Sequence, residues 1–290
     1  MTWVVGAATP FGYGTGISDI RVTFSNGGER DCLQKIYPVG RFIAAGFAGS
    51  VAIGFAMIDR LKELLFDSSE SKAWDPVIVS QWWAEDARAV FEKSSEKEQE
   101  LQSQIMLIGA HPSEHNGAPQ WPRCHVYTFS SPIFEPVEAK PPALAAIGCG
   151  TDVQQCRDAL NLIATDHDAW FNVLRGEQGT PGGMATLLAM NLTSLLQKTQ
   201  PRGISSHLHY CWVYRGRIVI KTNNHQSIGR WSTFPTGVDS PDIPATELHG
   251  QQEQSDPSAT NFAMPRIATS LNELNSLLRD QQISSTCALG

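Results

Sequence analysis

Four short motifs follow one another at close intervals in the first fifty residues of this 290-residue chain. Thr2 is followed by the acidic and basic pair of Asp19 and Arg21, and Lys35 lies sixteen residues after Asp19. Gly49 follows Lys35 by fourteen residues and ends the run Ala-Gly-Phe-Ala-Gly, after which an apolar segment with helical spacing begins. Each motif alone has an ordinary explanation, but their joint order and spacing are far more restrictive than any one of them.

Thr2 is a candidate reactive residue at the start of the chain. Its side chain is small, so a methionine aminopeptidase is expected to remove Met1 and leave Thr2 with a free α-amine. A hydroxyl is a poor nucleophile until a base takes its proton, and an α-amine with an unperturbed pKa of about 8 can serve as that base. If Met1 is retained, the amine is on the wrong residue and the site is blocked.

Together, Thr2, Asp19-Ile20-Arg21, Lys35-Ile36 and the run 45–49 resemble the proteasome β-subunit family of N-terminal nucleophile hydrolases. The likeness is to the bacterial branches in particular, the HslV peptidase and the ancestral β-subunit homologues. The family spacing from Asp19 to Gly49 is kept without a gap, and a hairpin turn at 12–16 can absorb one extra residue before Asp19. The resemblance covers roughly residues 2–222 and is most specific in about the first 65.

The resemblance implies a catalytic role for each motif. Thr2 would attack an amide carbonyl, and Lys35 would favour the neutral amine as a neighbouring cation. Asp19 would pair with Lys35 and hold it in place. The backbone N–H of Gly49, at the start of a helix, would donate to the oxyanion.

Substrate recognition is implied for Arg21 and Phe47, and the bulky ring of Phe47 is expected to narrow the substrate pocket. Ordinary alternatives remain for the individual residues. Asp19 and Arg21 can form a surface ion pair that contributes little. Lys35 can lie exposed at a strand end, and Gly49 can simply permit a tight turn from strand to helix.

Two departures from the family pattern bear on activity. Where the family commonly has Gly-Ser-Gly at a strand-to-helix turn, this chain has Cys149 in the serine position. A thiol is a weaker donor and acceptor than a hydroxyl, so we expect a slower site or one that uses a bound water. Between a reactive thiol and a buried spectator at Cys149, we favour the buried spectator. The loop at 200–206 lacks the aspartate of eukaryotic-type subunits, and Ser205 or Ser206 is the candidate for its serine.

The alternation of apolar segments predicts an α+β fold. Strands are predicted at 2–6, 17–24, 33–39, 41–48, 104–109, 124–129, 143–148, 207–214 and 217–222, and helices at 50–66, 76–91, 151–164 and 181–196. This order fits the four-layer α-β-β-α sandwich of the N-terminal nucleophile hydrolases, although pattern alone also permits a generic α+β sandwich.

Residues 2–222 are therefore predicted to form one domain of the proteasome β-like type. Residues 223–290 are a C-terminal extension rich in Ser, Thr, Gln, Pro and Asn, which is typical of irregular structure. Apolar side chains at helical spacing predict one amphipathic helix near 267–278. We expect that helix to dock on its own domain, with docking on a neighbouring subunit as the alternative.

Composition restricts the partners. A net charge of -7 argues against a nucleic-acid partner. The apolar runs are too short for a membrane-spanning helix, and no secretory signal precedes the first strand. The six cysteines show no paired spacing and read as free thiols in a reducing cytoplasm. We therefore expect a cytoplasmic protein that binds neither nucleic acid nor membrane.

One short run raises the question of a metal. His207, His209 and Cys211 would share one face of a strand, and two imidazoles and a thiol are metal ligands. A half-exposed strand face without a metal is the favoured interpretation, and no cofactor motif is present, so we expect neither metal nor cofactor.

Three functions are compatible with these observations. The first is a threonine-type peptidase or amidohydrolase, and the family resemblance implies that it self-associates into a homo-oligomeric ring enclosing peptide or small-amide substrates. The second is a hydrolase of one small amide or ester. The third is a catalytically silent ring that serves as a scaffold. The sequence does not identify an ATPase or adaptor partner.

Overall fold

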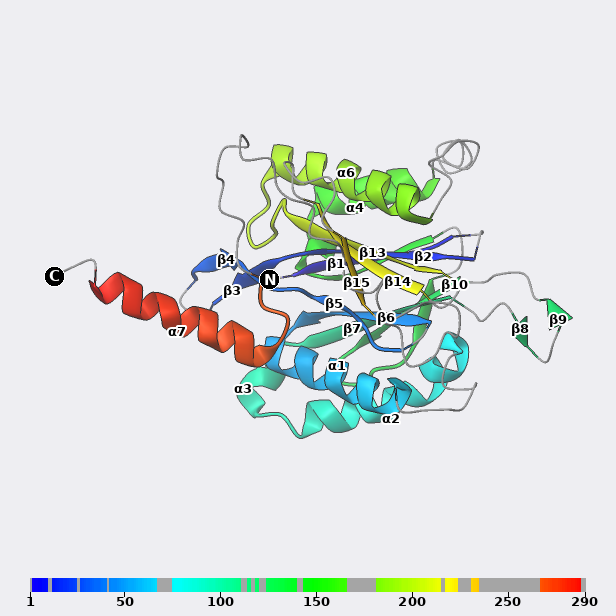
Figure 1. Cartoon of the computed structure of the whole chain (residues 1–290), viewed down its shortest axis with the longest axis horizontal. Coiled ribbons are helices and arrows are strands. Elements are labelled where there is room, and N and C mark those ends of the chain that lie inside the picture. The colour runs from blue at the N-terminus through cyan, green and yellow to red at the C-terminus, as the bar shows by residue number, and fades with distance from the viewer. Residues whose placement is uncertain are drawn as a thin grey trace.

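The structure is a computed structural model, and it describes residues 2–9, 12–24, 27–40, 42–66, 75–110, 114–115, 118–119, 124–139, 143–165, 181–214, 217–223, 231–234 and 267–287. These residues form a mixed α/β fold with two main antiparallel sheets (Figure 1). Within them, no helix combines the length and the apolarity needed to span a membrane.

The first sheet carries the start of the chain near its centre. Its strand order is β12-β1-β2-β13-β14-β15. The strands are β1 (Trp3–Ala8), β2 (Gly14–Asp19), β12 (Ala143–Gly148), β13 (Leu208–Tyr214), β14 (Arg217–Asn223) and β15 (Trp231–Phe234). Both faces of β1 are buried: Trp3 and Val5 contact the core under the helices, whereas Val4 contacts the core between the sheets.

The second sheet has the order β11-β10-β7-β6-β5. Its strands are β5 (Ile36–Pro38), β6 (Ile43–Gly49), β7 (Ser103–Ala110), β10 (Cys124–Ser130) and β11 (Val137–Ala139). The strands β3 (Arg21–Thr23) and β4 (Glu29–Asp31) form a separate small hairpin, as do β8 (Glu114–His115) and β9 (Ala118–Pro119). The two main sheets pack so closely that a Cβ on Gly16 would lie 2.5 Å from Ile108 Cδ1.

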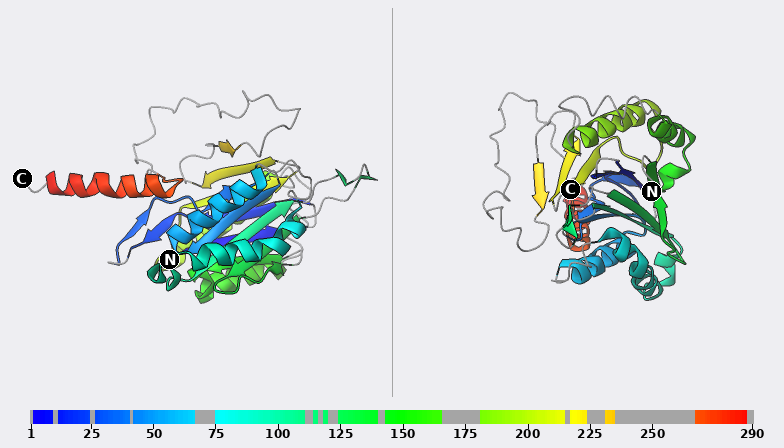
Figure 2. Two further views of the ribbon diagram at one scale, coloured as in Figure 1. Left: turned by 90° about the horizontal axis from the view of Figure 1, so that it is seen from below. Right: turned by 90° about the vertical axis from the view of Figure 1, so that its right-hand side faces the viewer.

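Helices cover the outer faces of the two sheets (Figure 2). The helices α4 (Gln154–Thr165) and α6 (Pro181–Thr199) lie on the first sheet, and α1 (Val51–Phe66) and α2 (Pro76–Glu92) lie on the second. The shorter elements are α3 (Glu96–Gln99) and a 3-10 turn, η2 (Cys149–Thr151). Asp75 caps α2, because its Oδ1 accepts the backbone N–H of Val77 at 2.8 Å.

The predicted segments correspond to observed elements, although several of their bounds differ. The strand predicted at 17–24 is divided at Ile20, where the chain leaves β2 and enters β3. The strand predicted at 33–39 is shortened to β5. The C-terminal helix α7 (Leu271–Cys287) begins four residues later than predicted, because the chain at Ala268 instead bonds the backbone of Cys32 and Gln34 at 2.7 and 3.0 Å.

Within the described residues, the C-terminal extension contacts the main body through β15, Ala268 and α7. Its strand β15 pairs with β14, and Leu274 and Leu277 of α7 are buried in the core that also contains α1. Beyond these contacts α7 extends away from the body (Figure 1). The boundary at residue 222 stays a prediction.

Candidate functional site

Thr2 lies at the start of β1 and is 6% exposed. The register of β1 with β12 pairs Trp3 with Gly148, so the turn that follows Gly148 is placed beside Thr2. The Thr2 nitrogen donates to Cys149 Sγ at 3.1 Å, and the thiol donates to the Thr2 carbonyl oxygen at 3.2 Å. Cys149 is thus a direct neighbour of the Thr2 main chain.

A buried ion pair lies next to this contact. Lys35 Nζ is 2.9 Å from Asp19 Oδ1, and the two side chains are 1% and 0% exposed. Asp19 also accepts the backbone N–H groups of Trp3 at 2.7 Å and Arg21 at 3.0 Å. Lys35 donates a second hydrogen bond to the Arg21 carbonyl at 2.5 Å. The alternatives of an exposed Lys35 and of a surface pair between Asp19 and Arg21 are therefore wrong.

Two glycines with positive φ permit close backbone approaches, one of them to Thr2. Gly148 has φ +88, and a Cβ there would lie 2.1 Å from the Thr2 carbonyl oxygen and 3.1 Å from Ala48 Cβ. Gly49 has φ +94, and its Cβ would collide with the Gln102 carbonyl at 1.7 Å. The end of β6 and the end of β12 therefore meet at Thr2.

Gly49 stands immediately before the start of a helix. Ser50 caps α1, because its Oγ accepts the Ile53 N–H at 3.2 Å. The first N–H groups of a helix have no partner within it, and the helix start favours negative charge. The predicted oxyanion role of Gly49 is consistent with this placement and stays a prediction.

Phe47 lies on the other side of the second sheet. Along β6, Ile43, Ala45 and Phe47 contact the core beneath the helices, whereas Ala44 and Ala48 face the first sheet. The Phe47 ring is 1% exposed and stacks on Tyr37, with ring centroids 6.3 Å apart. Other residues line the two cavities described below, so a substrate-pocket role for Phe47 stays a prediction.

Asp31 is a further residue of the site that the sequence did not single out. Its carboxylate accepts two hydrogen bonds from the Arg21 guanidinium. Nε donates to Oδ1 at 2.7 Å, and Nη2 donates to Oδ2 at 3.3 Å. Ser205 Oγ donates to Asp31 Oδ2 at 2.6 Å, and His207 Nδ1 lies 3.3 Å from the same oxygen. These contacts tie the hairpin of β3 and β4 to the loop between α6 and β13. Ser205, not Ser206, bonds the carboxylate.

The electrostatics of Asp31 and Cys149 differ. Burial raises the pKa of the Asp31 carboxyl, but hydrogen bonds from His207, Arg21 and Ser205 outweigh burial, and the pKa lies well below its usual range. Burial also raises the pKa of the Cys149 thiol. Cys149 is therefore a protonated thiol near neutral pH, which suits a hydrogen-bonding neighbour of Thr2 better than a second nucleophile.

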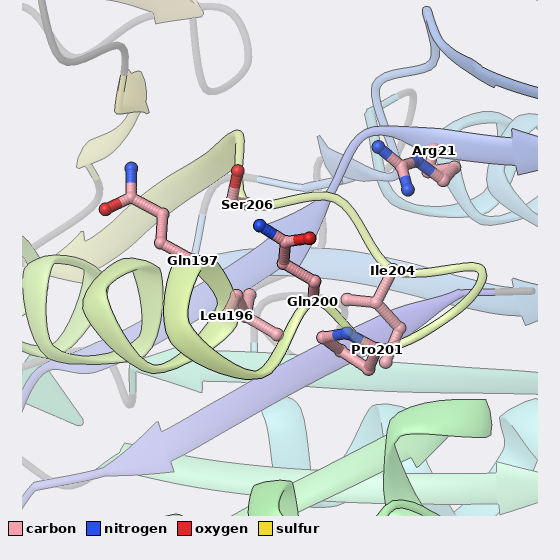
Figure 3. A pocket seen from close by; sticks show the side chains of 7 residues that line it. All are labelled: Arg21, Leu196, Gln197, Gln200, Pro201, Ile204 and Ser206. Atoms are coloured by element: carbon pink, nitrogen blue, oxygen red, sulfur yellow. The ribbon is translucent and has the colours of Figure 1, made fainter.

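Two cavities flank the loop between α6 and β13. One of about 280 Å³ is lined by Arg21, Leu196, Gln197, Gln200, Pro201, Ile204 and Ser206 (Figure 3). The other, of about 380 Å³, is lined by Cys149, Asp152, Val153, Gln155, Thr199, Pro201 and Arg202. The larger cavity is lined by Cys149, which contacts the Thr2 main chain, and the smaller cavity is lined by Arg21, whose backbone bonds Asp19 and Lys35. Pro201 lines both cavities.

The residues considered for a metal differ in exposure. His209 and Cys211 are buried, whereas His207 precedes β13 and its side chain is 42% exposed. Among the residues that the structure describes, no three His, Cys, Asp or Glu side chains form a group that could hold a metal ion.

His209 makes the stability of the fold depend on pH. Neither of its ring nitrogens has a hydrogen-bond partner, and burial, with a smaller effect of Lys35, lowers its pKa to about 4. In the unfolded chain His209 takes up a proton near pH 6.5, whereas in the folded chain it does so only near pH 4. His209 therefore has no effect on the free energy of unfolding above about pH 6.5, and it lowers that free energy increasingly as the pH falls towards 4. Wild type should lose roughly 3 kcal/mol more than His209→Leu across this window. Urea denaturation of both proteins at several pH values measures this, and parallel pH curves would contradict it.

If Thr2 is a nucleophile, as the resemblance implies, replacing Cys149 by serine should speed hydrolysis. A hydroxyl is a stronger donor and acceptor than a thiol, so Cys149→Ser should hold Thr2 more firmly at the same two contacts. We expect kcat/KM to rise by roughly threefold to tenfold, as one improved hydrogen bond allows. Cys156→Ser is the matched control, because Cys156 is a buried residue of α4 and should give no gain.

Comparisons with known proteins support the fold. No protein-family model matches the chain, and a search of curated proteins found no match. Its fold is similar to that of Anbu (ancestral beta-subunit) from Yersinia bercovieri, with a TM-score of 0.52 and 12% identity over 76% of this chain and 81% of that one. It is also similar to an Anbu (Gly-1) mutant from Hyphomicrobium sp. strain MC1, with a TM-score of 0.55 and 14% identity over 79% of this chain and 89% of that one.

At these identities the likeness concerns the fold alone. The chain shares its fold with these ancestral β-subunit proteins, in agreement with one of the two resemblances drawn from the sequence. The resemblance to HslV stays a prediction.

Proposed function

We propose that this chain is a threonine-type amidohydrolase that uses mature Thr2 as its nucleophile, on a four-layer α-β-β-α sandwich. One observation carries the proposal: a fully buried Asp19–Lys35 ion pair is bonded to the backbone N–H of Trp3, the residue next to Thr2, and to the backbone carbonyl of Arg21. Burying two charges is costly unless each is paired and hydrogen-bonded, and strongly desolvated charges in a cleft are typical of functional sites.

The proposed reaction begins with the loss of Met1. The freed Thr2 amine stays neutral because the Lys35 cation disfavours a second positive charge beside it. Thr2 Oγ attacks the amide carbonyl carbon while the Thr2 amine takes the hydroxyl proton. The Gly49 N–H stabilises the oxyanion, and the amine returns the proton to the leaving nitrogen as the carbon–nitrogen bond breaks. Water then hydrolyses the ester that links the acyl group to Thr2.

The assembly belongs to the same proposal. We infer a homo-oligomeric ring in the cytoplasm that admits peptides or small amides to an enclosed chamber. The structural similarity to ancestral β-subunit proteins supports this inference. The acidic net charge of -7 agrees with the absence of a nucleic-acid partner.

A second candidate is a hydrolase of one small amide or ester. The sizes of the two cavities favour it, because about 280 and 380 Å³ lie near the lower end of the range typical of small-molecule pockets. Pro201 lines both cavities, so a compact substrate would bind beside it, between the two cavities.

A panel of fluorogenic peptides and simple acyl amides separates the two candidates. The leading proposal expects hydrolysis of peptides several residues long, with rates that fall when the peptide is shortened. Hydrolysis confined to small acyl amides would favour the second candidate. No hydrolysis of any member by protein that has lost Met1 would count against both.

A further inference from the structure

The cavity beside Arg21 has walls of two kinds. Arg21 reaches it from the start of β3, and α6 with its following loop forms the rest (Figure 3). Leu196, Pro201 and Ile204 supply the apolar part of the lining. Gln197, Gln200 and Ser206 supply side-chain amides and a hydroxyl, which both donate and accept hydrogen bonds.

The only guanidinium of this lining is already neutralised by carboxylates. Arg21 makes two contacts with Asp31, at 2.7 and 3.3 Å, and one with Glu29 at 3.2 Å. Arg202 Nε lies 4.0 Å from Glu29, so two guanidiniums face two carboxylates here. The charged groups that border the cavity therefore balance, in spite of the arginine in its wall.

Asp31 is held firmly in this arrangement. Ser205 and His207 bond the same carboxylate from the segment between α6 and β13, and the Asp31 side chain is 18% exposed. An acidic ligand would have to compete with Asp31 for Arg21, and a basic ligand would find both carboxylates occupied. An uncharged polar group does not compete with Asp31 for Arg21 and does not need a free carboxylate. It gives up hydrogen bonds to water and gains hydrogen bonds to the amides and the hydroxyl of the lining.

The cavity lies within reach of the reacting centre. The Arg21 backbone N–H bonds Asp19, and the Arg21 carbonyl accepts from Lys35. A substrate whose amide bond lies at Thr2 would thus place a neighbouring side chain near Arg21. The cavity volume of about 280 Å³ suits one such side chain.

We propose that this cavity is a substrate subsite that accepts an uncharged side chain with hydrogen-bonding groups, such as a carboxamide, and that Asp31 sets this preference by occupying Arg21. The inference rests on the proposed hydrolase function. It assigns Asp31 a role in specificity rather than in bond cleavage.

Peptides of one scaffold in which each position in turn is Gln, Glu, Lys or Leu test the proposal, with cleavage followed by mass spectrometry. At one position we expect kcat/KM for Gln to exceed that for Glu by about tenfold or more, as expected for a site built around hydrogen bonds. Asp31→Asn frees the Arg21 guanidinium to pair with a substrate carboxylate, so at that same position Glu should become equal to or better than Gln. Adding Arg21→Gln to Asp31→Asn should remove the gain for Glu.

Glu85→Gln is the matched control, since Glu85 is exposed on α2, on the far sheet, and its loss changes the net charge equally. It should leave the preference unchanged. The subsite proposal is overturned if cleavage shows no preference for Gln over Glu, or if the Asp31→Asn variant keeps the selectivity of wild type. Either result leaves the hydrolase proposal standing. If wild type neither cleaves a peptide nor reacts with a β-lactone at Thr2, both proposals fail. Thermal unfolding of each variant confirms that it is folded.

Discussion

Thr2→Ala should abolish hydrolysis, with a fall in kcat/KM of at least about a thousandfold. The reason is chemical: alanine lacks the hydroxyl that forms the ester, and no neighbouring group replaces it. Cys149, which bonds the Thr2 main chain, is a protonated thiol because burial raises its pKa. The measurement is steady-state hydrolysis of the best substrate found in the peptide panel, with protein whose mass shows that Met1 has been removed.

Thr2→Ser is the matched control for this prediction. It keeps the hydroxyl and the amine and removes only a methyl group, so it should retain measurable activity. Both variants should unfold at urea concentrations close to that of wild type, because the Thr2 side chain has no hydrogen bond among the described contacts. Full hydrolysis by Thr2→Ala would show that another residue is the nucleophile.

Lys35→Met should unfold the protein more easily as well as inactivate it. Methionine fills a similar volume but leaves the Asp19 carboxylate buried without its cation, and removing one partner of a buried pair costs about 3–5 kcal/mol. Activity should fall at least about a hundredfold, because the Thr2 amine loses the charge that keeps it neutral. Urea denaturation gives the free energy of unfolding, and the pH dependence of kcat/KM reports the pKa of the amine.

The double variant Asp19→Asn with Lys35→Met separates stability from catalysis. Asparagine keeps an acceptor for the backbone N–H of Trp3 or Arg21 and removes the buried charge, so the double variant should be more stable than Lys35→Met alone. It should remain inactive. An active double variant would show that the ion pair serves the fold and has no part in the reaction.

The sequence predicted the elements that place the ion pair. Apolar periodicity predicted strands at 17–24 and 33–39, which contain Asp19 and Lys35. In the structure Asp19 ends β2 and Lys35 immediately precedes β5, and both side chains are buried. Their partnership is therefore encoded within a short stretch of chain.

Other features depend on contacts between distant parts of the chain. Asp31 and Ser205 are 174 residues apart, and nothing in the local sequence around either residue signals the other. The orientation of Phe47 follows from the register of β6, which turns alternate side chains towards the helices or towards the first sheet. A shift of one residue in that register would have turned Phe47 to the opposite face, and the motif alone does not fix it.

The intact mass of untagged protein, before and after treatment with a threonine-reactive β-lactone, tests the central claim most directly. We expect the mass of the chain without Met1, then the addition of one lactone in wild type and none in Thr2→Ala. Lys35→Met should react much more slowly than wild type. Retained Met1, or a mature Thr2 that never forms the adduct in folded protein, would contradict an N-terminal threonine nucleophile.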